Sequence, residues 1–235
     1  MEFLTIFDMN PMSNRLSKSV FHAFVVAASI AIFCTAVVGN AAAQNAEISG
    51  FVLVNAVASS DPIMASYDGK SVLAPPGLRQ ASATSGLGVG VGSGVISVSH
   101  PTLGSAEAAM EIKVGTTPIV VAFTENTVAK PGQPAKQKIA LQVLPAKSSK
   151  QPLFRVFYAA GKSDSAVTLK LNNKAATLLP WRSQMIQDSN LSVVVGETSI
   201  GNFSLEGSEP NAVFIARDGK NGFFAVSVPE IIYNW

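Results

Sequence analysis

The chain repeats itself at one long and constant spacing, and this repeat limits the possible folds more than any other feature. Residues 52–96 match residues 156–200 without a gap, at an offset of 104, and eleven positions are identical. Unrelated segments of ordinary composition would share roughly three. So long a period indicates whole domains rather than the short units of a solenoid. The identical pairs are Val52/Val156, Ala56/Ala160, Ser59/Ser163, Lys70/Lys174, Pro76/Pro180, Gln80/Gln184, Leu87/Leu191, Val89/Val193, Val91/Val195, Gly92/Gly196 and Ile96/Ile200.

Both copies open with the same order of strands and turns. A largely apolar run, 49–56 or 153–160, is followed by a polar turn and then by apolar residues at every second position. Alternation of this kind predicts a strand with one buried face. Asp68–Gly69 and Asn172–Asn173 come next, and these residue types tolerate the positive φ of a tight hairpin turn. The ungapped match then aligns the segment "LGVGVG" at 87–92 with "LSVVVG" at 191–196 as equivalent strands.

Short apolar segments continue to the end of the chain, and none shows a convincing helical period. Many short strands at regular spacing predict antiparallel sandwiches. The segment "PAKSSKQP" at 145–152, bounded by two prolines, reads as an exposed linker. We therefore expect an all-β protein with two tandem antiparallel β-sandwich domains, immunoglobulin-like in architecture, at 46–144 and 153–235.

The N-terminal residues have the pattern of a secretory signal. Arg15 and Lys18 precede an apolar run of 15 residues at 24–38, and Ala41 and Ala43 suit cleavage before Gln44. The alternative is a membrane anchor, but a span needs about 20 apolar residues. We expect a signal peptide at 1–43, a periplasmic or secreted protein, and no membrane span in the mature chain.

Charge and cysteine content exclude several classes of function. The formal net charge is only +2 and no basic run occurs, which argues against a nucleic-acid partner. Cys34 lies in the signal segment, so the mature chain has no disulfide and no thiolate metal site. The loop around Asp218 lacks the carboxylates of a calcium site and reads as a hairpin turn. No metal or cofactor is expected.

Two features invite a catalytic interpretation. The glycine-rich stretch 86–94 has neither G-x-G-x-x-G nor a G-K-S/T ending, so it predicts a strand with one bare face packed on another backbone. His100 is the one histidine of the mature chain and could serve a small hydrolase. It has no nucleophile-elbow context, and we expect a surface or turn residue. No catalytic residue is predicted.

The aromatic residues near the C-terminus suggest where a partner binds. The ending "EIIYNW" resembles the closing strand of an outer-membrane barrel, but its alternation breaks at Pro229. Trp and Arg are over-represented at binding hot spots. We therefore expect Trp181, Arg182, Tyr233 and Trp235 to form an exposed partner-binding patch.

The repeated motif resembles a family of exported proteins. "VNAVASSDPIMASYDGK" at 54–70 is similar to the opening of exported β-sandwich domains of uncharacterised function. The tandem layout and "FRVFYAAGKSDSAVTLKLNNK" at 154–174 resemble the AlgF family, periplasmic proteins of alginate O-acetylation. The resemblance implies two small β-sandwiches after a signal peptide, acting as a non-enzymatic partner of the acetylation machinery, and it carries over no catalytic residue.

Three functions remain open at this point. The first is an exported, non-enzymatic adaptor in exopolysaccharide O-acetylation or cell-envelope assembly, with envelope proteins or polysaccharide as partners. The second is a secreted surface or matrix domain pair that binds a glycan or a protein. The third is a small hydrolase that uses His100.

Overall fold

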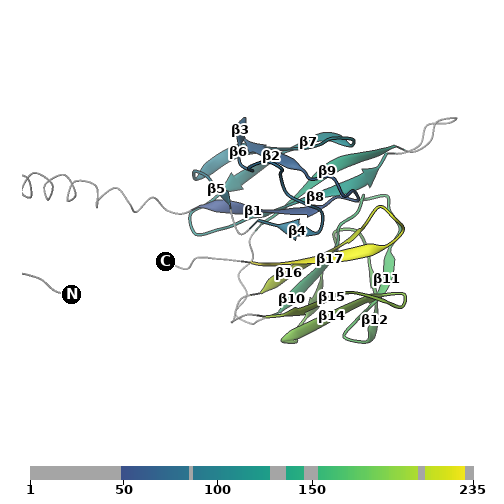
Figure 1. The fold of residues 1–235 in the computed structure, drawn as a ribbon. Coiled ribbons are helices and arrows are strands. Elements are labelled where there is room, and N and C mark those ends of the chain that lie inside the picture. The colour runs from purple at the N-terminus through teal and green to yellow at the C-terminus, as the bar shows by residue number, and fades with distance from the viewer. Residues whose placement is uncertain (1–48, 85–86, 128–135, 146–152, 206–209, 231–235) are drawn as a thin grey trace, which may run out of the picture. The chain divides into compact units, whose positions relative to one another are not determined.

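The part of the chain that the structure describes is built from β-strands. The structure is a computed structural model that describes residues 49–84, 87–127, 136–145, 153–205 and 210–230 (Figure 1). Seventeen strands within these ranges form four sheets, and no described residue is helical. The all-β prediction is confirmed. The expected signal peptide at 1–43 and residues 146–152 of the expected linker lie outside the described residues.

The first copy contributes two sheets. Sheet I consists, in spatial order, of β3 (Lys70–Ser71), β2 (Met64–Tyr67), β6 (Gly92–His100) and β7 (Gly104–Ile112). Sheet II consists of β4 (Ser82–Ala83), β1 (Gly50–Ala56), β8 (Ile119–Asn126) and β9 (Gln137–Leu144), with β5 (Leu87–Gly88) also paired to β1.

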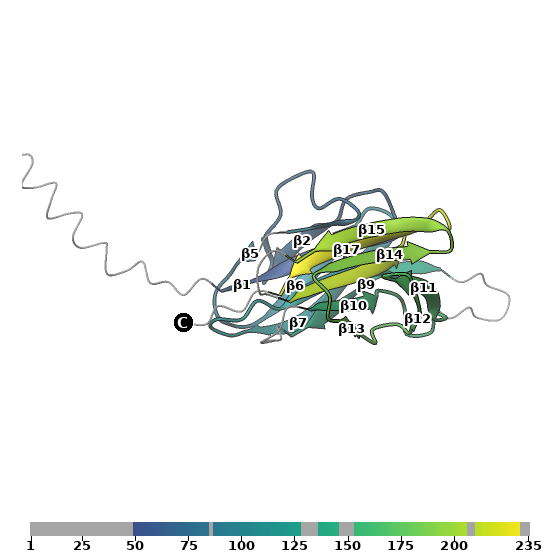
Figure 2. The ribbon, with the colours of Figure 1, turned by 90° about the horizontal axis from the view of Figure 1, so that it is seen from below.

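The second copy contributes two further sheets. Sheet III consists of β13 (Gln184–Ile186), β10 (Phe154–Tyr158), β16 (Asn211–Arg217) and β17 (Phe223–Pro229). Sheet IV consists of β12 (Lys174–Leu178), β11 (Val167–Leu171), β14 (Asn190–Val195) and β15 (Thr198–Ser204). Figure 2 shows β14 and β15 side by side in this sheet.

Sheets II and III each contain a parallel pair, which corrects the expectation of purely antiparallel sheets. β1 runs parallel to β8, and β10 runs parallel to β16, while the other pairs are antiparallel. In both copies two hairpins of the other sheet separate the two parallel strands, and short antiparallel strands (β4 and β5, or β13) return to the first strand between these hairpins. After the second hairpin, β8 or β16 enters beside the first strand in the same direction, so this pair is parallel.

A hydrophobic core lies between the two sheets of each copy. In the first copy, Phe51 and Leu53 of β1 pack with Ile96 and Val98 of β6. In the second, Val156 and Tyr158 of β10 fill the same role with residues of β11 and β14. The alternation predicted for β2 and β11 is therefore explained, because every second side chain points into one of these cores.

A third core joins sheet II to sheet III. Val54 and Phe123 belong to the same buried cluster as Phe157 and Phe214, whose rings stack at 5.4 Å. The strands β1, β8, β10 and β16 thus bury both faces over most of their length. Double burial explains why their sequences are continuous apolar runs rather than alternating ones.

A buried ion pair lies on the same face of sheet III as Phe157. The Nε atom of Arg155 donates to both carboxylate oxygens of Glu230, each at 2.8 Å. The Arg155 guanidinium also lies 5.3 Å from the centre of the Phe157 ring. Because an unpaired buried charge is costly, the carboxylate is what allows Arg155 to sit in this apolar layer.

The strand correspondence read from the ungapped match is wrong beyond the first hairpin. Tyr67 pairs with Ile96 in the first copy and Leu171 pairs with Val193 in the second. The offset is therefore 104 for β2 and β11 (171 − 67) but 97 for β6 and β14 (193 − 96). β6 corresponds to β14. β5 corresponds to the end of β13, because Leu87 pairs with Phe51 as Met185 pairs with Arg155, at an offset of 98 (185 − 87). The first copy carries seven extra residues (104 − 97) before β6.

Candidate functional site

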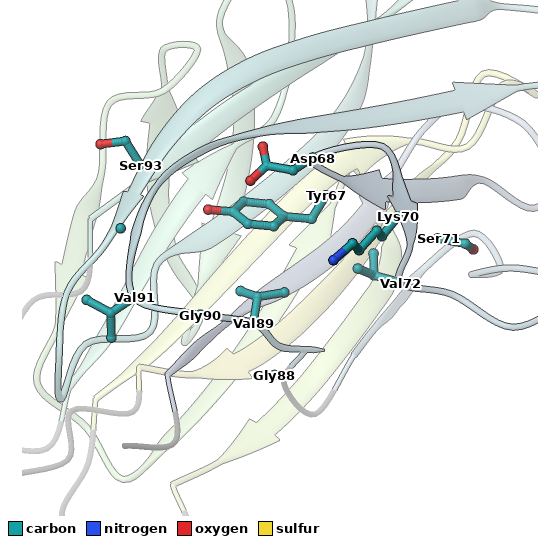
Figure 3. A pocket seen from close by; sticks show the side chains of 11 residues that line it. Tyr67, Asp68, Lys70, Ser71, Val72, Gly88, Val89, Gly90, Val91 and Ser93 are labelled. Carbon is teal, nitrogen blue, oxygen red and sulfur yellow. The ribbon is translucent and has the colours of Figure 1, made fainter. Parts of the chain in front are cut away.

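One described groove lies between the first hairpin and the segment that leads from β5 into β6. It has a volume of about 480 Å³ and is lined by residues of the β2–β3 hairpin, 67–72, and by the segment 88–93. We name it the glycine groove. Figure 3 shows the Tyr67 ring and the Lys70 ammonium pointing toward the segment that carries Val89 and Val91.

Asp68 fixes the hairpin to the neighbouring strand. It adopts a φ of 48° and Gly69 a φ of 76°, so the tight turn predicted for these two residues is confirmed. The backbone N–H of Asp68 donates to the Val95 carbonyl at 3.0 Å, and the Val95 N–H donates to Asp68 Oδ1 at 2.8 Å. One side of the glycine groove is therefore held rigidly against β6.

Tyr67 forms part of the floor of the glycine groove. Its side chain is largely buried, and its ring lies 6.0 Å from that of Phe51. A Cβ atom on Gly94 would overlap the Tyr67 hydroxyl, so only glycine leaves room for the ring. Burial raises the pKa of the Tyr67 phenol, and the negative charge of Asp68 adds to the effect. The phenol therefore stays protonated at neutral pH and can donate a hydrogen bond.

The opposite wall of the glycine groove is thin and accessible. Gly88, Gly90 and Gly92 face open space, and the side chain of Val91 is 50% exposed. The prediction that the bare face packs on another backbone is wrong for these three glycines. One wall of the groove thus offers bare backbone and the exposed Val91. The other offers the polar groups of Tyr67, Asp68 and Lys70, so the groove can bind a ligand that has both polar and apolar surfaces.

A second groove adjoins the equivalent hairpin of the second copy. It has a volume of about 380 Å³ and is lined by Asn172 and Asn173 of the turn and by residues 190–192 and 202–204. We name it the asparagine groove. Asn172 and Asn173 have φ values of 48° and 64°, which confirms the predicted hairpin turn. Ser192 N–H donates to Asn172 Oδ1 at 2.7 Å, as Val95 does to Asp68.

His100 is buried rather than exposed at the surface. It ends β6 and retains 4% of its exposure, while its Nδ1 accepts the backbone N–H groups of Thr102 and Leu103, each at 3.2 Å. Burial lowers the pKa of His100, and the Asp61 carboxylate opposes this effect. The Nε2 atom has no hydrogen-bond partner among the described residues. The imidazole thus shapes the 100–104 turn and does not line either groove.

The structure describes only two of the four residues expected to form a partner-binding patch. Trp181 is half-buried, its ring meets Phe123 edge-on at 4.8 Å, and its Nε1 donates to the Ala160 carbonyl at 2.8 Å. Arg182 is exposed. Tyr233 and Trp235 lie outside the described residues. The patch remains a prediction, and the described contacts place Trp181 against the core shared by sheets II and III.

The described ranges contain neither a metal-ligand cluster nor a helix suited to a membrane span. No three His, Cys, Asp or Glu side chains gather there in a way that could hold a metal ion. No helix in the same ranges is long and apolar enough to cross a membrane. Asp218 caps its hairpin, as predicted, by accepting the N–H groups of Lys220 and Gly222 at 2.7 and 2.9 Å.

Sequence reasoning missed both grooves, although one signal for each was visible. The bare face predicted for the glycine-rich stretch was expected to pack on another backbone, yet alternating glycines can equally leave the backbone open to solvent. In the second copy, four asparagines lie within residues 172–202, around the hairpin and two strands. Only the fold brings them together. Comparison with known proteins found no family model that matches the chain and no curated protein that matches it.

Proposed function

We propose that the chain is an exported, non-enzymatic binding protein whose two tandem β-sandwich domains, 46–144 and 153–235, hold a polysaccharide of the cell envelope. In this proposal a signal peptide is cleaved near Ala43 and Gln44, and the mature protein acts in the periplasm or outside the cell. It serves as an adaptor in exopolysaccharide O-acetylation or envelope assembly, with envelope proteins as further partners. The resemblance to the AlgF family supports this part.

The recurrence of a groove beside the same hairpin in both copies is the observation that carries the proposal. Asp68 and Asn172 each accept a backbone N–H from the neighbouring strand, and each adjoins an open groove. A chain with the same groove in both copies can bind two units of one ligand, so it suits a polymer built of repeating units. Two weak sites on one chain bind such a polymer far more tightly than either site alone.

The chemistry of the glycine groove supports the same ligand class. Pyranose rings present hydroxyl groups at their edges and C–H groups on their faces. Tyr67, Asp68 and Lys70 can donate to or accept from hydroxyl groups, while Val89 and Val91 offer apolar surface. Open backbone at Gly88 and Gly90 leaves space for a chain that continues past the groove.

Two measurements test the proposal together. The tagged full chain, expressed in its own host, is captured from the envelope fraction, and the bound proteins and polysaccharide are identified by mass spectrometry and sugar analysis. We expect polysaccharide to be recovered, and the Lys70→Ala and Val91→Asp double variant to recover several-fold less of it. A protein that stays in the cytoplasm, or capture without any envelope component, would contradict the proposal.

A further inference from the structure

The asparagine groove differs from the glycine groove in charge. The eight residues that line it, all of them described, carry no ionisable side chain. The glycine groove in contrast contains Asp68 and Lys70. The one charged group hydrogen-bonded to a lining residue, within the described part, is the carboxylate of Asp188, which accepts from Asn172 Nδ2 at 2.9 Å. This arrangement offers nothing to neutralise an anionic ligand.

One wall of the asparagine groove is fixed by Asn172. Its Nδ2 donates to Asp188 and also to the Asn190 carbonyl at 3.0 Å, while its Oδ1 accepts from Ser192 N–H. These bonds occupy both functions of the amide. Asn172 therefore positions the groove and has little capacity left for a ligand.

A second pair of side chains is fixed in the same way. Ser204 Oγ donates to Asn190 Oδ1 at 2.7 Å, and Asn190 Nδ2 donates to Ser189 Oγ at 3.3 Å. Asn190 and Ser204 are opposite each other on β14 and β15. The rim is thus ordered before any ligand arrives, which reduces the conformational entropy lost on binding.

Two side-chain amides remain available beside these fixed groups. Asn173 and Asn202 are exposed, and no interaction among the described residues involves their side chains. Each amide presents two N–H donors and one acceptor oxygen in a plane. Neighbouring hydroxyl groups of a sugar each donate and accept, so they complement amides of this kind without any charge.

Resting on the proposed function, we infer that the asparagine groove is a subsite for one uncharged pyranose unit of a glycan. Asn173 and Asn202 contact the sugar hydroxyls, and the Asn172 and Asn190 networks hold the groove in shape. The volume of about 380 Å³ lies in the range of small-molecule sites, which runs from about 300 to 1,000 Å³. Because the rim is exposed, an internal unit of a polymer can enter without a free chain end.

The test uses the full exported chain labelled with ¹⁵N. Neutral gluco-, manno- and galacto-oligosaccharides are titrated in, and uronic-acid oligosaccharides form a separate arm. The variant is Asn173→Gly with Asn202→Ala, where glycine keeps the positive φ of 64° at position 173. The matched control is Thr168→Ala with Thr177→Ala, which changes two exposed, paired residues of sheet IV outside the groove.

We expect at least one neutral oligosaccharide to shift the side-chain NH₂ signals of Asn173 and Asn202, and the groove variant to weaken its binding at least about tenfold. The control variant should bind as the parent does. Binding that the groove variant leaves unchanged, or that only the uronic-acid arm shows, would overturn the inference. So would a lack of binding by every neutral sugar, whereas polysaccharide recovered in the capture experiment would still support the proposed function.

Discussion

Asp68 holds the backbone of Val95 at two points, through its own N–H at 3.0 Å and through its side-chain Oδ1 at 2.8 Å. Asn172 makes the same two bonds to Ser192 in the second copy, at 3.0 and 2.7 Å. The two copies thus share the same pair of hydrogen bonds between the hairpin and the next strand, although the side chain differs. What the site requires is an acceptor oxygen on a residue that tolerates a φ of 48°.

The first prediction follows from this equivalence. Asp68→Asn should leave the free energy of unfolding nearly unchanged, because the amide oxygen can accept the Val95 N–H. Asp68→Ala should lower it by about 1–2 kcal/mol, since it removes the hydrogen bond and places alanine in a left-handed conformation. Urea denaturation of the purified chain measures both values. Equal losses for the two variants would show that the negative charge, and not the acceptor, is what the hairpin needs.

The second prediction separates two glycines of the same stretch. Gly94→Ala should lower the free energy of unfolding by about 1–3 kcal/mol, because the added methyl group overlaps the Tyr67 ring. Gly90→Ala is the matched control, since no heavy atom lies within 4 Å of the position of its Cβ. Its stability should stay within about 0.5 kcal/mol of the parent.

The displacement of the Tyr67 ring in Gly94→Ala should also change the alkaline titration of its phenol. Its phenol has a raised pKa because it is buried. If Gly94→Ala pushes the ring toward solvent, the alkaline titration of Tyr67 should move to lower pH, while Gly90→Ala should leave it in place. Ultraviolet difference spectra across the alkaline range measure the shift, and an unchanged titration in Gly94→Ala would contradict the described position of the ring.

The third prediction concerns acid sensitivity at His100. Burial lowers the pKa of its imidazole in the folded chain, so the unfolded chain binds a proton at higher pH than the folded chain does. The stability is therefore fully present above the unfolded pKa of about 6.5 and is lost as the pH falls below it. Urea unfolding at several pH values between about 5.5 and 7.5 measures the slope.

His100→Asn is the variant that isolates this effect. Its Oδ1 can accept the N–H groups that now bind Nδ1, but it does not titrate in this range. The variant is expected to be less stable at neutral pH, because it is smaller, and to show a smaller change with pH. The other histidine, His22, is present in both chains, so its effect cancels in the comparison. An identical slope in parent and variant would assign the acid sensitivity to other groups.

The features that short-range chemistry controls were predicted correctly from the sequence. The turns at Asp68–Gly69 and Asn172–Asn173 depend on which residues tolerate positive φ, and the structure has them in place. Alternation likewise identified β2 and β11. In contrast, the ungapped match aligned Val89 with Val193, because glycine and valine recur at the same spacing in both segments. Only strand pairing shows that the offset changes.

The parallel pairs and the third core were not predicted because they depend on long-range packing. The apolar runs at 49–56 and 153–160 were visible, and their lack of alternation indicates burial on both faces. A sequence does not show which surface covers the second face. The grooves are also long-range features, since each combines a hairpin with segments at least 16 residues away (88 − 72).

The last prediction decides what Trp181 does. Its ring packs on Phe123 of sheet II, and its Nε1 bonds to the Ala160 carbonyl, so it connects residues of both copies. Trp181→Ala should therefore lower the free energy of unfolding by about 3–5 kcal/mol, as is usual when a large packed aromatic is truncated. Trp181→Phe keeps an aromatic ring and loses the hydrogen bond, so it should cost less. The exposed neighbour Arg182 provides the control, and Arg182→Ala should leave stability unchanged. If Trp181→Ala unfolds at the same urea concentration as the parent but loses capture of the envelope partner, Trp181 belongs to a binding patch and not to the core between the sheets.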